Sequence, residues 1–265
     1  MILVIYKSIR KNMKNFYNSF KFLGVGLLRA KHLSQLQLVE SDVCTIFAQM
    51  AQRNGAIIEN IRSQIGQDVF ALFALNWKRN GFFVEFGATN GIELSNTYLL
   101  EKDFGWTGIL AEPAKVWHSE LKKNRTAAVD FDCVWRETGQ KLGFTGSSVA
   151  ELSTITEFVG RDSHAYLRAG GDTYEVNTVS LSDLLVRHNA PRDIDFLSVD
   201  TEGSEFDILA SFDFNSYRIS VITCEHNFSP QREKIHKLLL SNGFSRVYQG
   251  FSRWDDWFVN NELQF

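Results

Sequence analysis

Short apolar runs alternate with amphipathic stretches along most of this chain. The strand-like runs cover residues 82–86, 107–111, 127–135, 174–179, 193–200, 219–224, 244–249 and 257–260. Between them, apolar positions recur at helical spacing in residues 69–78, 93–102, 113–124, 181–188, 206–211 and 230–242. Strands that alternate with helices are typical of a doubly wound α/β fold with a mostly parallel sheet. We expect the last two runs to pair as an antiparallel hairpin that closes the sheet.

One stretch, residues 81–112, organises the rest of the chain. Its first apolar run leads into a turn made of Gly87, Ala88, Thr89, Asn90 and Gly91. A helix-like segment follows, and a second apolar run ends on Glu112. Glycines let the backbone turn sharply and let a ligand approach closely, and the N–H groups at a helix start suit a carboxylate or a phosphate. Glu112 is placed to accept hydrogen bonds from both hydroxyls of a ribose.

The composition of the turn indicates which nucleoside it suits. The G-x-G-x-x-G pattern of nicotinamide and flavin sites is missing, and Glu85 lies at the end of the first strand instead. An acid there would repel a pyrophosphate, but it suits an ammonium group. S-adenosylmethionine has an ammonium, a carboxylate, a sulfonium and a ribose diol, and Glu85, the turn backbone and Glu112 match this ligand in order. The alternative is an ordinary βα turn with no ligand.

Further candidates lie where later strands end, because ligands of an open α/β sheet bind outside the carboxyl ends of its strands. Pro113 follows the second strand and fits the first turn of a helix. Asp132 is a candidate for the adenine amino group, with a plain strand-end acid as the other interpretation, and Cys133 is a candidate for the adenine face. The strand of residues 193–200 ends in Asp200, and Glu202 follows two residues later.

The next strand ends in Glu225, His226 and Asn227. Methyl transfer to an aliphatic hydroxyl needs a general base or a metal, because the hydroxyl has a pKa far above neutral. His226 is the best single base, since an unperturbed imidazole has a pKa of about 6.5, and Asp200 and Glu225 complete the predicted catalytic set. A structural role for His226 is the alternative. Asp200, Glu225 and Asn227 can also be read as oxygen ligands of a divalent cation, but we favour a site without metal.

Composition limits the class of function. Of 265 residues, 44% are hydrophobic and 13% aromatic, which provides for a large core and apolar pockets. A net charge of −3 argues against a nucleic-acid partner and leaves a small molecule or a glycan as the expected acceptor. Cys44, Cys133 and Cys224 fit no metal spacing and indicate buried thiols in a reducing cytosol. A cytoplasmic protein is therefore expected, since no run reaches transmembrane length.

The chain is expected to have two parts, a basic helical extension in residues 1–60 and a catalytic domain in residues 61–265. Residues 1–39 carry Lys and Arg but no acid, and their apolar positions recur at roughly helical spacing. A basic amphipathic helix can lie on an anionic membrane, which would make this extension a peripheral membrane contact. We favour the alternative, a helix packed on the domain or on a second subunit.

Two polar segments adjoin the predicted elements. Residues 142–171 are rich in Gly, Ser and Thr, and their length indicates a functional or mobile loop. In the sequence SQIGQD, Ser63, Gln64 and Asp68 are candidates to cap the helix that follows. Gln67 and Asp68 are alternatively placed to touch the cofactor.

Three motifs, FVEFGATNGIELSNTYLLEKDFGWTGILAEP, FLSVDTEGSEFDIL and WDDWFV, resemble the FkbM-type S-adenosylmethionine-dependent methyltransferases, and SQIGQD resembles the entry motif of that family. The resemblance covers residues 63–259 in order. It implies a class I methyltransferase fold, with a seven-stranded, mostly parallel sheet and an antiparallel closing strand. It also implies O-methylation, often of sugars in polysaccharide or natural-product pathways. Asn96 would face the pocket, and Asp200 with Glu202 would be the acids after the fourth strand. Glu85 stands where an aspartate is common.

Three hypotheses follow from the sequence. The first is an O-methyltransferase acting on a hydroxyl of a sugar, a polysaccharide or a hydroxylated metabolite. The second is a catalytically inactive nucleoside- or glycan-binding module of the same fold, against which the presence of Asp200 and His226 argues. The third is a nicotinamide-dependent oxidoreductase, which the missing glycine pattern disfavours.

Overall fold

The computed structural model of this chain describes residues 60–160, 165–168, 170–250 and 252–263. The chain divides into two compact units, Met1–Asn60 and Ile61–Phe265. The predictions for residues 1–59, which include the amphipathic helix and its membrane contact, lie outside the described residues. Among the described helices, none is both long and apolar enough to cross a bilayer.

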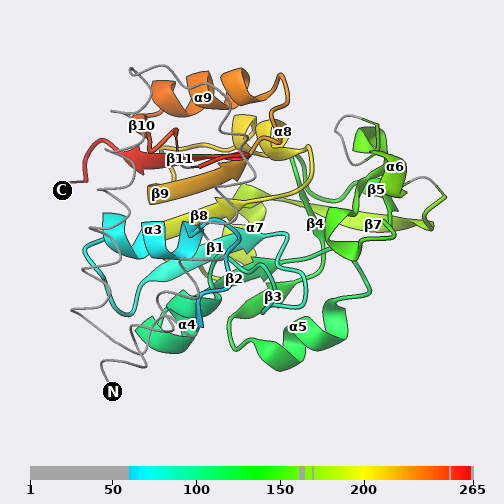
Figure 1. The fold of residues 1–265 in the computed structure, drawn as a ribbon, viewed down its shortest axis with the longest axis horizontal. Helices are drawn as coiled ribbons and strands as arrows, with labels where there is room; N and C mark the ends of the chain where they lie inside the picture. Colours follow the sequence, from blue (N-terminus) through cyan, green and yellow to red (C-terminus); the bar gives the residue numbers. More distant parts are fainter. Residues whose placement is uncertain (1–59, 161–164, 169, 251, 264–265) are drawn as a thin grey trace, which may run out of the picture. The chain divides into compact units, whose positions relative to one another are not determined.

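A seven-stranded sheet forms the centre of the second unit (Figure 1). In spatial order its strands are β10 (Phe244–Val247), β11 (Asp255–Asn260), β9 (Arg218–Glu225), β8 (Asp193–Val199), β1 (Phe82–Phe86), β2 (Thr107–Ala111) and β3 (Ala128–Asp130). β11 runs antiparallel to both of its neighbours, and the other strand pairs are parallel. The predicted α/β sheet, mostly parallel with an antiparallel closing strand, is confirmed.

Helices cover both faces of this sheet. They are α3 (Gln67–Ala74), α4 (Tyr98–Phe104), α5 (His118–Asn124), α7 (Leu181–Arg187), α8 (Glu205–Ala210) and α9 (Arg232–Ser241). Apolar residues of α7, α8 and α9 share one buried cluster with Val84 and Phe86 of β1. Side chains alternate along a strand, so Glu85 faces the other side of the sheet. There, α3 stacks Phe70 on Trp257 of β11, with 4.6 Å between the ring centroids.

The burial of the central strand β8 fixes the position of the carboxyl edge of the sheet. Every residue of β8 after Asp193 is buried, as expected for a parallel strand covered on both faces. The Asp195 carboxylate accepts hydrogen bonds from the Phe82 N–H (2.9 Å) and from Nζ of Lys78 (2.6 Å), which ties β8 to the start of β1. These two hydrogen bonds compensate the burial of the Asp195 carboxylate near the amino end of β8. The buried strand in turn fixes the position at which the chain leaves the sheet after Val199.

A second sheet departs from the expectation based on sequence. It is built from β4 (Cys133–Trp135), β7 (Thr173–Ser180), β5 (Lys141–Thr145) and β6 (Thr154–Ile155), in that spatial order. The single third strand predicted for residues 127–135 is wrong, because only β3 stays in the main sheet while β4 pairs with β7. In Figure 1, β5 and β7 lie to the right of the main sheet.

Residues 142–171, which were predicted to form a loop, have regular secondary structure over much of their length. Besides β5 and β6, they contain the 3-10 turns η2 (Ala150–Leu152) and η3 (Thr156–Phe158) and the short helix α6 (Ala165–Arg168). Trp135, Phe144 and Phe158 belong to a separate small core under the second sheet. Strands this short carry almost no periodicity, since what stabilises them is packing against residues distant in sequence.

Candidate active site

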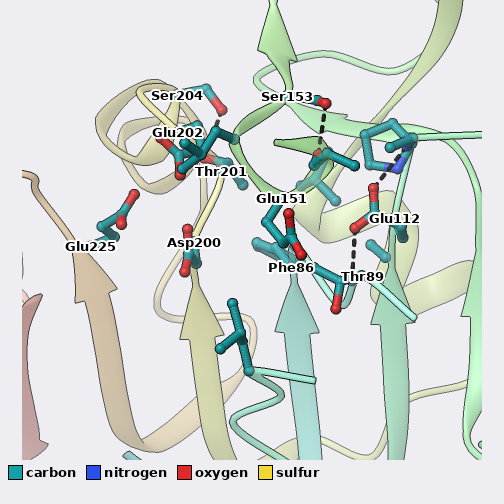
Figure 2. Close-up of a pocket in the computed structure, with 18 of the residues that line it drawn as sticks. Phe86, Thr89, Glu112, Glu151, Ser153, Asp200, Thr201, Glu202, Ser204 and Glu225 are labelled. Carbon is teal, nitrogen blue, oxygen red and sulfur yellow. Dashed lines mark hydrogen bonds between the residues drawn. The ribbon is translucent and has the colours of Figure 1, made fainter. Parts of the chain in front are cut away.

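A cavity of about 580 Å³ opens at the carboxyl ends of β1, β2, β8 and β9. The opposite wall comes from the second sheet, through residues 149–153 and Ile155. Figure 2 shows Glu112, Asp200 and Glu225 at the ends of β2, β8 and β9, with Glu151 reaching in from η2. Carboxylates from separate parts of the chain therefore meet in one space.

Glu112 is held in this cavity by two backbone donors. Its Oε2 accepts the Thr89 N–H at 2.8 Å, and its Oε1 accepts the Ala114 N–H at 2.7 Å. Burial raises the pKa of Glu112 to about 7, although these two bonds oppose the rise. Each carboxylate oxygen has more than one lone pair, so both can accept a further hydrogen bond. A fixed carboxylate with two available acceptors suits a pair of adjacent hydroxyls.

Glu85 lines the cavity, as its position in the sequence predicts, and it is also hydrogen-bonded within the protein. Its Oε1 accepts the Asn96 N–H at 2.6 Å, and its Oε2 accepts the hydroxyls of Ser95 and Thr97. Nη1 of Arg125 lies 3.7 Å from the same Oε2. The carboxylate therefore supports the adjacent turn as well as lining the cavity.

This arrangement also explains an error in the predicted helix boundary. A helix was expected from residue 93, but α4 begins at Tyr98. The Glu85 carboxylate fixes residues 95–97 in a turn, and Oδ1 of Asn90 accepts the N–H groups of Ile92 and Glu93, both at 2.9 Å. The N–H groups expected to bind a ligand anion are therefore satisfied within the protein.

Asn96 contributes an acceptor that has no partner. Its Nδ2 donates to Oγ of Ser198 at 2.9 Å. Its Oδ1 is buried and has no hydrogen-bond partner in the described part of the chain, and the residue is 6% exposed and lines the cavity. A buried acceptor without a donor is costly, so a donor supplied by a ligand would compensate it.

The two turn glycines are required for different contacts. Gly87 has φ of 74°, and a Cβ there would lie 2.2 Å from the Asp200 carbonyl oxygen. Gly91 has φ of 81°, and a Cβ there would lie 2.6 Å from Cγ of Arg125. Gly87 lines the cavity, whereas Gly91 allows close packing against the protein itself. Only glycine meets both demands without strain.

Asp200 and Glu225 form the most unusual pair in the cavity. Their carboxylate oxygens lie within 4.8 Å of each other, and burial raises the pKa of Asp200 to about 7. Burial also raises the pKa of Glu225 well above its usual range, and repulsion from Asp200 adds to the effect. Two buried carboxyl groups this close do not both ionise readily, so the pair holds a proton between them near neutral pH.

Glu202 lies beside this pair but has a basic partner. Oxygen atoms of Asp200, Glu202 and Glu225 all lie within 4.8 Å of one another. Nη2 of Arg168 in α6 donates to Oε2 of Glu202 at 2.8 Å, and the Arg168 side chain is fully buried. Oγ1 of Thr154 donates to the Glu202 carbonyl oxygen at 2.9 Å. The second sheet is thereby fastened to the loop after β8.

With this geometry established, comparison with known proteins identifies the family. The model of the methyltransferase FkbM domain matches residues 85–263, which is more than half of the chain. The chain belongs to the FkbM methyltransferase family. Membership implies S-adenosylmethionine as the methyl donor, and the matched range includes Glu112, Asn96 and the Asp200–Glu225 pair.

Solved structures give only distant likenesses to this FkbM chain. The precorrin-6y C5,15-methyltransferase of Geobacter metallireducens is 11% identical with a TM-score of 0.38, and the alignment covers 72% of this chain and 85% of that one. A proposed RNA methyltransferase of Pyrococcus horikoshii is 12% identical with a TM-score of 0.35, with coverage of 78% and 85%. Scores this low do not inform the activity. No curated protein gave a significant match.

His226 of this FkbM methyltransferase, predicted to be the catalytic base, does not line the cavity. Its Nδ1 accepts the Phe228 N–H at 2.9 Å, so its Nε2 carries the proton and donates to the Asp255 carbonyl oxygen at 3.0 Å. Burial lowers its pKa. Neither nitrogen is available to take a proton from a substrate. The ring instead supports a strained turn, because Asn227 and Phe228 both have positive φ, 44° and 55°.

The other predicted residues divide into two groups. Pro113 and Cys133 line the cavity, and burial raises the pKa of the Cys133 thiol to about 12. Ala88, Asn90 and Asp132 do not line it. The Asp132 carboxylate accepts from Nη1 of Arg187 at 2.8 Å, outside the cavity. The chain bends at residue 132 between β3 and β4, which belong to different sheets, and Asp132 does not reach the space where an adenine was expected.

The segment before α3 contributes less than predicted. Nε2 of Gln67 donates to Oδ2 of Asp255 at 2.9 Å, and Asp68 accepts the hydroxyl of Ser63 at 2.5 Å. Gly66 occupies the N-cap of α3, and no side chain caps it. Of the predicted capping and cofactor residues in this segment, only Gln64 lines the cavity.

Several residues of the cavity carry no signal in the sequence. Glu151 enters from η2, and Val149 and Ser153 flank it. Phe228 and Trp254 line the side nearest β9, and Phe228 is 70% exposed. Phe228 lies three residues after the end of β9, so its position could have been predicted from the sequence. Glu151 lies in a segment without periodicity, so its place depends on the second sheet.

Proposed function

We propose that this protein is an S-adenosylmethionine-dependent O-methyltransferase that acts on a hydroxyl of a sugar, a polysaccharide or a hydroxylated metabolite. The observation that carries the proposal is the fixation of Glu112. Two backbone N–H groups hold its carboxylate at the end of β2, inside the cavity, with an acceptor on each oxygen for one ribose hydroxyl. The class I methyltransferase fold is part of the same proposal.

The cavity also fits the amino-acid end of the cofactor. The unpartnered Oδ1 of Asn96 accepts a hydrogen bond from an ammonium N–H, and Gly87 keeps the backbone close to the ligand. When bound, the cofactor supplies an electrophilic methyl group on its sulfonium. The protein itself binds and orients the cofactor and the acceptor and excludes water from the cavity. These are the main contributions of a protein to an in-line displacement.

The acceptor proton is assigned to the Asp200–Glu225 pair. A general base acts best when its pKa lies near the working pH, and burial raises the pKa of Asp200 to about 7. The ionised member of the pair would take the hydroxyl proton as the oxygen accepts the methyl group, and the electrons of the broken C–S bond would stay with S-adenosylhomocysteine as it leaves. His226 takes no part, because both of its nitrogens are hydrogen-bonded within the protein.

The walls of the cavity support a hydroxylated acceptor. Carboxylates accept hydrogen bonds from hydroxyls, and the exposed ring of Phe228 offers an apolar surface to the carbon face of a sugar. A cytoplasmic location is part of the proposal, and the free, buried thiols of Cys133 and Cys224 support it.

The test uses S-adenosylmethionine with a deuterated methyl group and a panel of polysaccharide-derived acceptors. We expect a product three mass units heavier than an ordinary methyl ether, with the label on oxygen, and much less product from Glu112→Ala at a limiting concentration of the labelled cofactor. Label found on nitrogen or carbon would overturn O-methylation. Failure of the protein to bind S-adenosylhomocysteine in calorimetry would overturn the assignment of the cofactor site.

A further inference from the structure

The charged side chains that line the cavity are all acidic. Among its described lining residues there is no Lys, Arg or His, and the acids are Glu85, Glu112, Glu151, Asp200, Glu202 and Glu225. Two of these acids face buried arginines that do not line the cavity: Glu85 faces Arg125, and Glu202 faces Arg168. The remaining four have no basic partner in the described part of the chain. A ligand that brings positive charge would compensate them.

Two of the four are also without hydrogen-bond donors from other residues. Asp200 and Glu225 have only each other, and Glu225 is 7% exposed. Burial raises the pKa of both groups; repulsion from Glu205 adds to the rise at Asp200, and repulsion from Asp200 adds to the rise at Glu225.

The cofactor alone does not balance this charge. S-adenosylmethionine brings a sulfonium and an ammonium, but also a carboxylate, so it adds one net positive charge. Glu112 and Glu151 lie in the same cavity as the Asp200–Glu225 pair, so charge remains uncompensated on the side of the acceptor. An anionic acceptor would add repulsion in a partly desolvated space, which strongly disfavours binding.

We propose that the acceptor carries an amino group, as an amino sugar does, and that its ammonium lies between Asp200 and Glu225. This inference rests on the proposed function, because it assigns the substrate class of the same site. The three donors of an ammonium match two carboxylates that have no other donor. Phosphorylated and carboxylated acceptors are excluded by the same carboxylates. The exposed ring of Phe228 covers the apolar face of the sugar.

A divalent cation at Asp200, Glu202 and Glu225 is the competing occupant, since their oxygens are close enough to share one ion. The Arg168 guanidinium, 2.8 Å from Glu202, argues against it. That positive charge repels a metal and already occupies one oxygen of the third ligand. Two carboxylates then remain, a set that suits an ammonium better than an ion that takes six or more oxygen ligands.

The test measures binding of three probes to the protein loaded with S-adenosylhomocysteine, by calorimetry at pH 7.5. Compared with D-glucose, D-glucosamine has an ammonium in place of the 2-hydroxyl, and D-glucose 6-phosphate has an anionic group on the 6-hydroxyl. We expect glucosamine to bind at least tenfold more tightly than glucose and the phosphate to show no binding. Glu225→Gln should bring glucosamine and glucose to within about threefold of each other. Glu175→Gln is the matched control, because Glu175 is an exposed residue of β7 outside the cavity, and it should leave the preference unchanged.

Each other result counts against the inference. Equal binding of glucosamine and glucose, no binding of glucosamine, or tighter binding of the phosphate would overturn it. So would binding of Mg²⁺ alone that Glu225→Gln abolishes, which would assign the cluster to a metal. Loss of S-adenosylhomocysteine binding would instead contradict the proposed function, so the two failures are distinguishable.

Discussion

The carboxyl edge of the main sheet and the second sheet line one cavity, yet they hold their residues there in different ways. At the sheet edge, Glu112 follows directly from a buried parallel strand and is fixed by two backbone N–H groups. In the second sheet, Glu151 sits on η2, a single 3-10 turn between short strands. The first wall is set by local sequence, and the second by pairing between distant segments.

This difference suggests a division of labour. A βα edge positions groups that must meet a cofactor of constant shape. A connecting segment that packs on the edge can change without disturbing it, as loops on a rigid scaffold do. We therefore assign cofactor binding, proton transfer and the contacts to the acceptor ammonium to the sheet edge, and the opposite wall of the acceptor space to the second sheet. The expected outcomes below test that assignment, from the largest effect to the smallest.

The largest effect should come from the sheet edge. Glu225→Gln removes a charge from the proton-sharing pair, and we expect kcat to fall by roughly two to four orders of magnitude. Steady-state kinetics with an acceptor from the panel measures this. His226→Gln is the matched control, because His226 is the next residue but its ring is bonded away from the cavity. The kcat of His226→Gln should stay within a few fold of the wild-type value. A loss of kcat equal to that of Glu225→Gln would refute the assignment of proton transfer to Glu225 and not to His226.

The attachment of the second sheet should show the next effect. Arg168→Met breaks a buried ion pair and removes the guanidinium that faces the buried Glu202 carboxylate. Such a change costs about 3–5 kcal/mol of unfolding free energy. Denaturant unfolding measures it. The control is Lys141→Met, whose pair with Glu175 is exposed on both sides and should matter by less than about 1 kcal/mol. Similar losses in both variants would mean that Arg168 does not fasten the two walls.

A smaller effect concerns pH. Burial raises the pKa of Asp200 to about 7, so the folded state holds this proton more tightly than the unfolded state. The contribution of Asp200 to stability is therefore largest at low pH and falls as the pH rises toward 7. The lowered pKa values of His118 and His226 act in the opposite direction, so the comparison must be made with a variant. Asp200→Asn should melt a few degrees above the wild type at pH 8, and the gap should close near pH 4. If the difference in melting temperature between Asp200→Asn and the wild type stayed constant with pH, ionisation of Asp200 could not be its cause.

Sequence predicted the main sheet because its signals are local. Val84 and Phe86 alternate with Glu85, and the apolar run of β8 is long and bounded by acids. The second sheet was missed because β6 has two residues and its partners are distant. The strand-end acids Glu112, Asp200 and Glu225 could be found by position, since β2, β8 and β9 end there.

The roles of single side chains were harder to predict than their positions. Glu85 and His226 both stand at strand ends, as expected, but their hydrogen bonds go to the protein. Whether a strand-end group faces the ligand depends on which side of the strand it projects from and on the turn that follows. Glu225 is the last residue of β9 and lines the cavity, whereas the His226 ring is hydrogen-bonded to the Phe228 N–H and the Asp255 carbonyl oxygen and does not.

The central claim is that the sheet edge binds the cofactor while the second sheet faces the acceptor. Calorimetric titration of S-adenosylhomocysteine into the wild type, Glu112→Ala and Glu151→Gln tests it most directly. Charge-assisted hydrogen bonds contribute about 1.5–3 kcal/mol each, so Glu112→Ala should weaken binding at least tenfold while remaining folded. Glu151→Gln should stay within about twofold of the wild type. Unchanged affinity in folded Glu112→Ala, or an equal loss in both variants, would contradict the account.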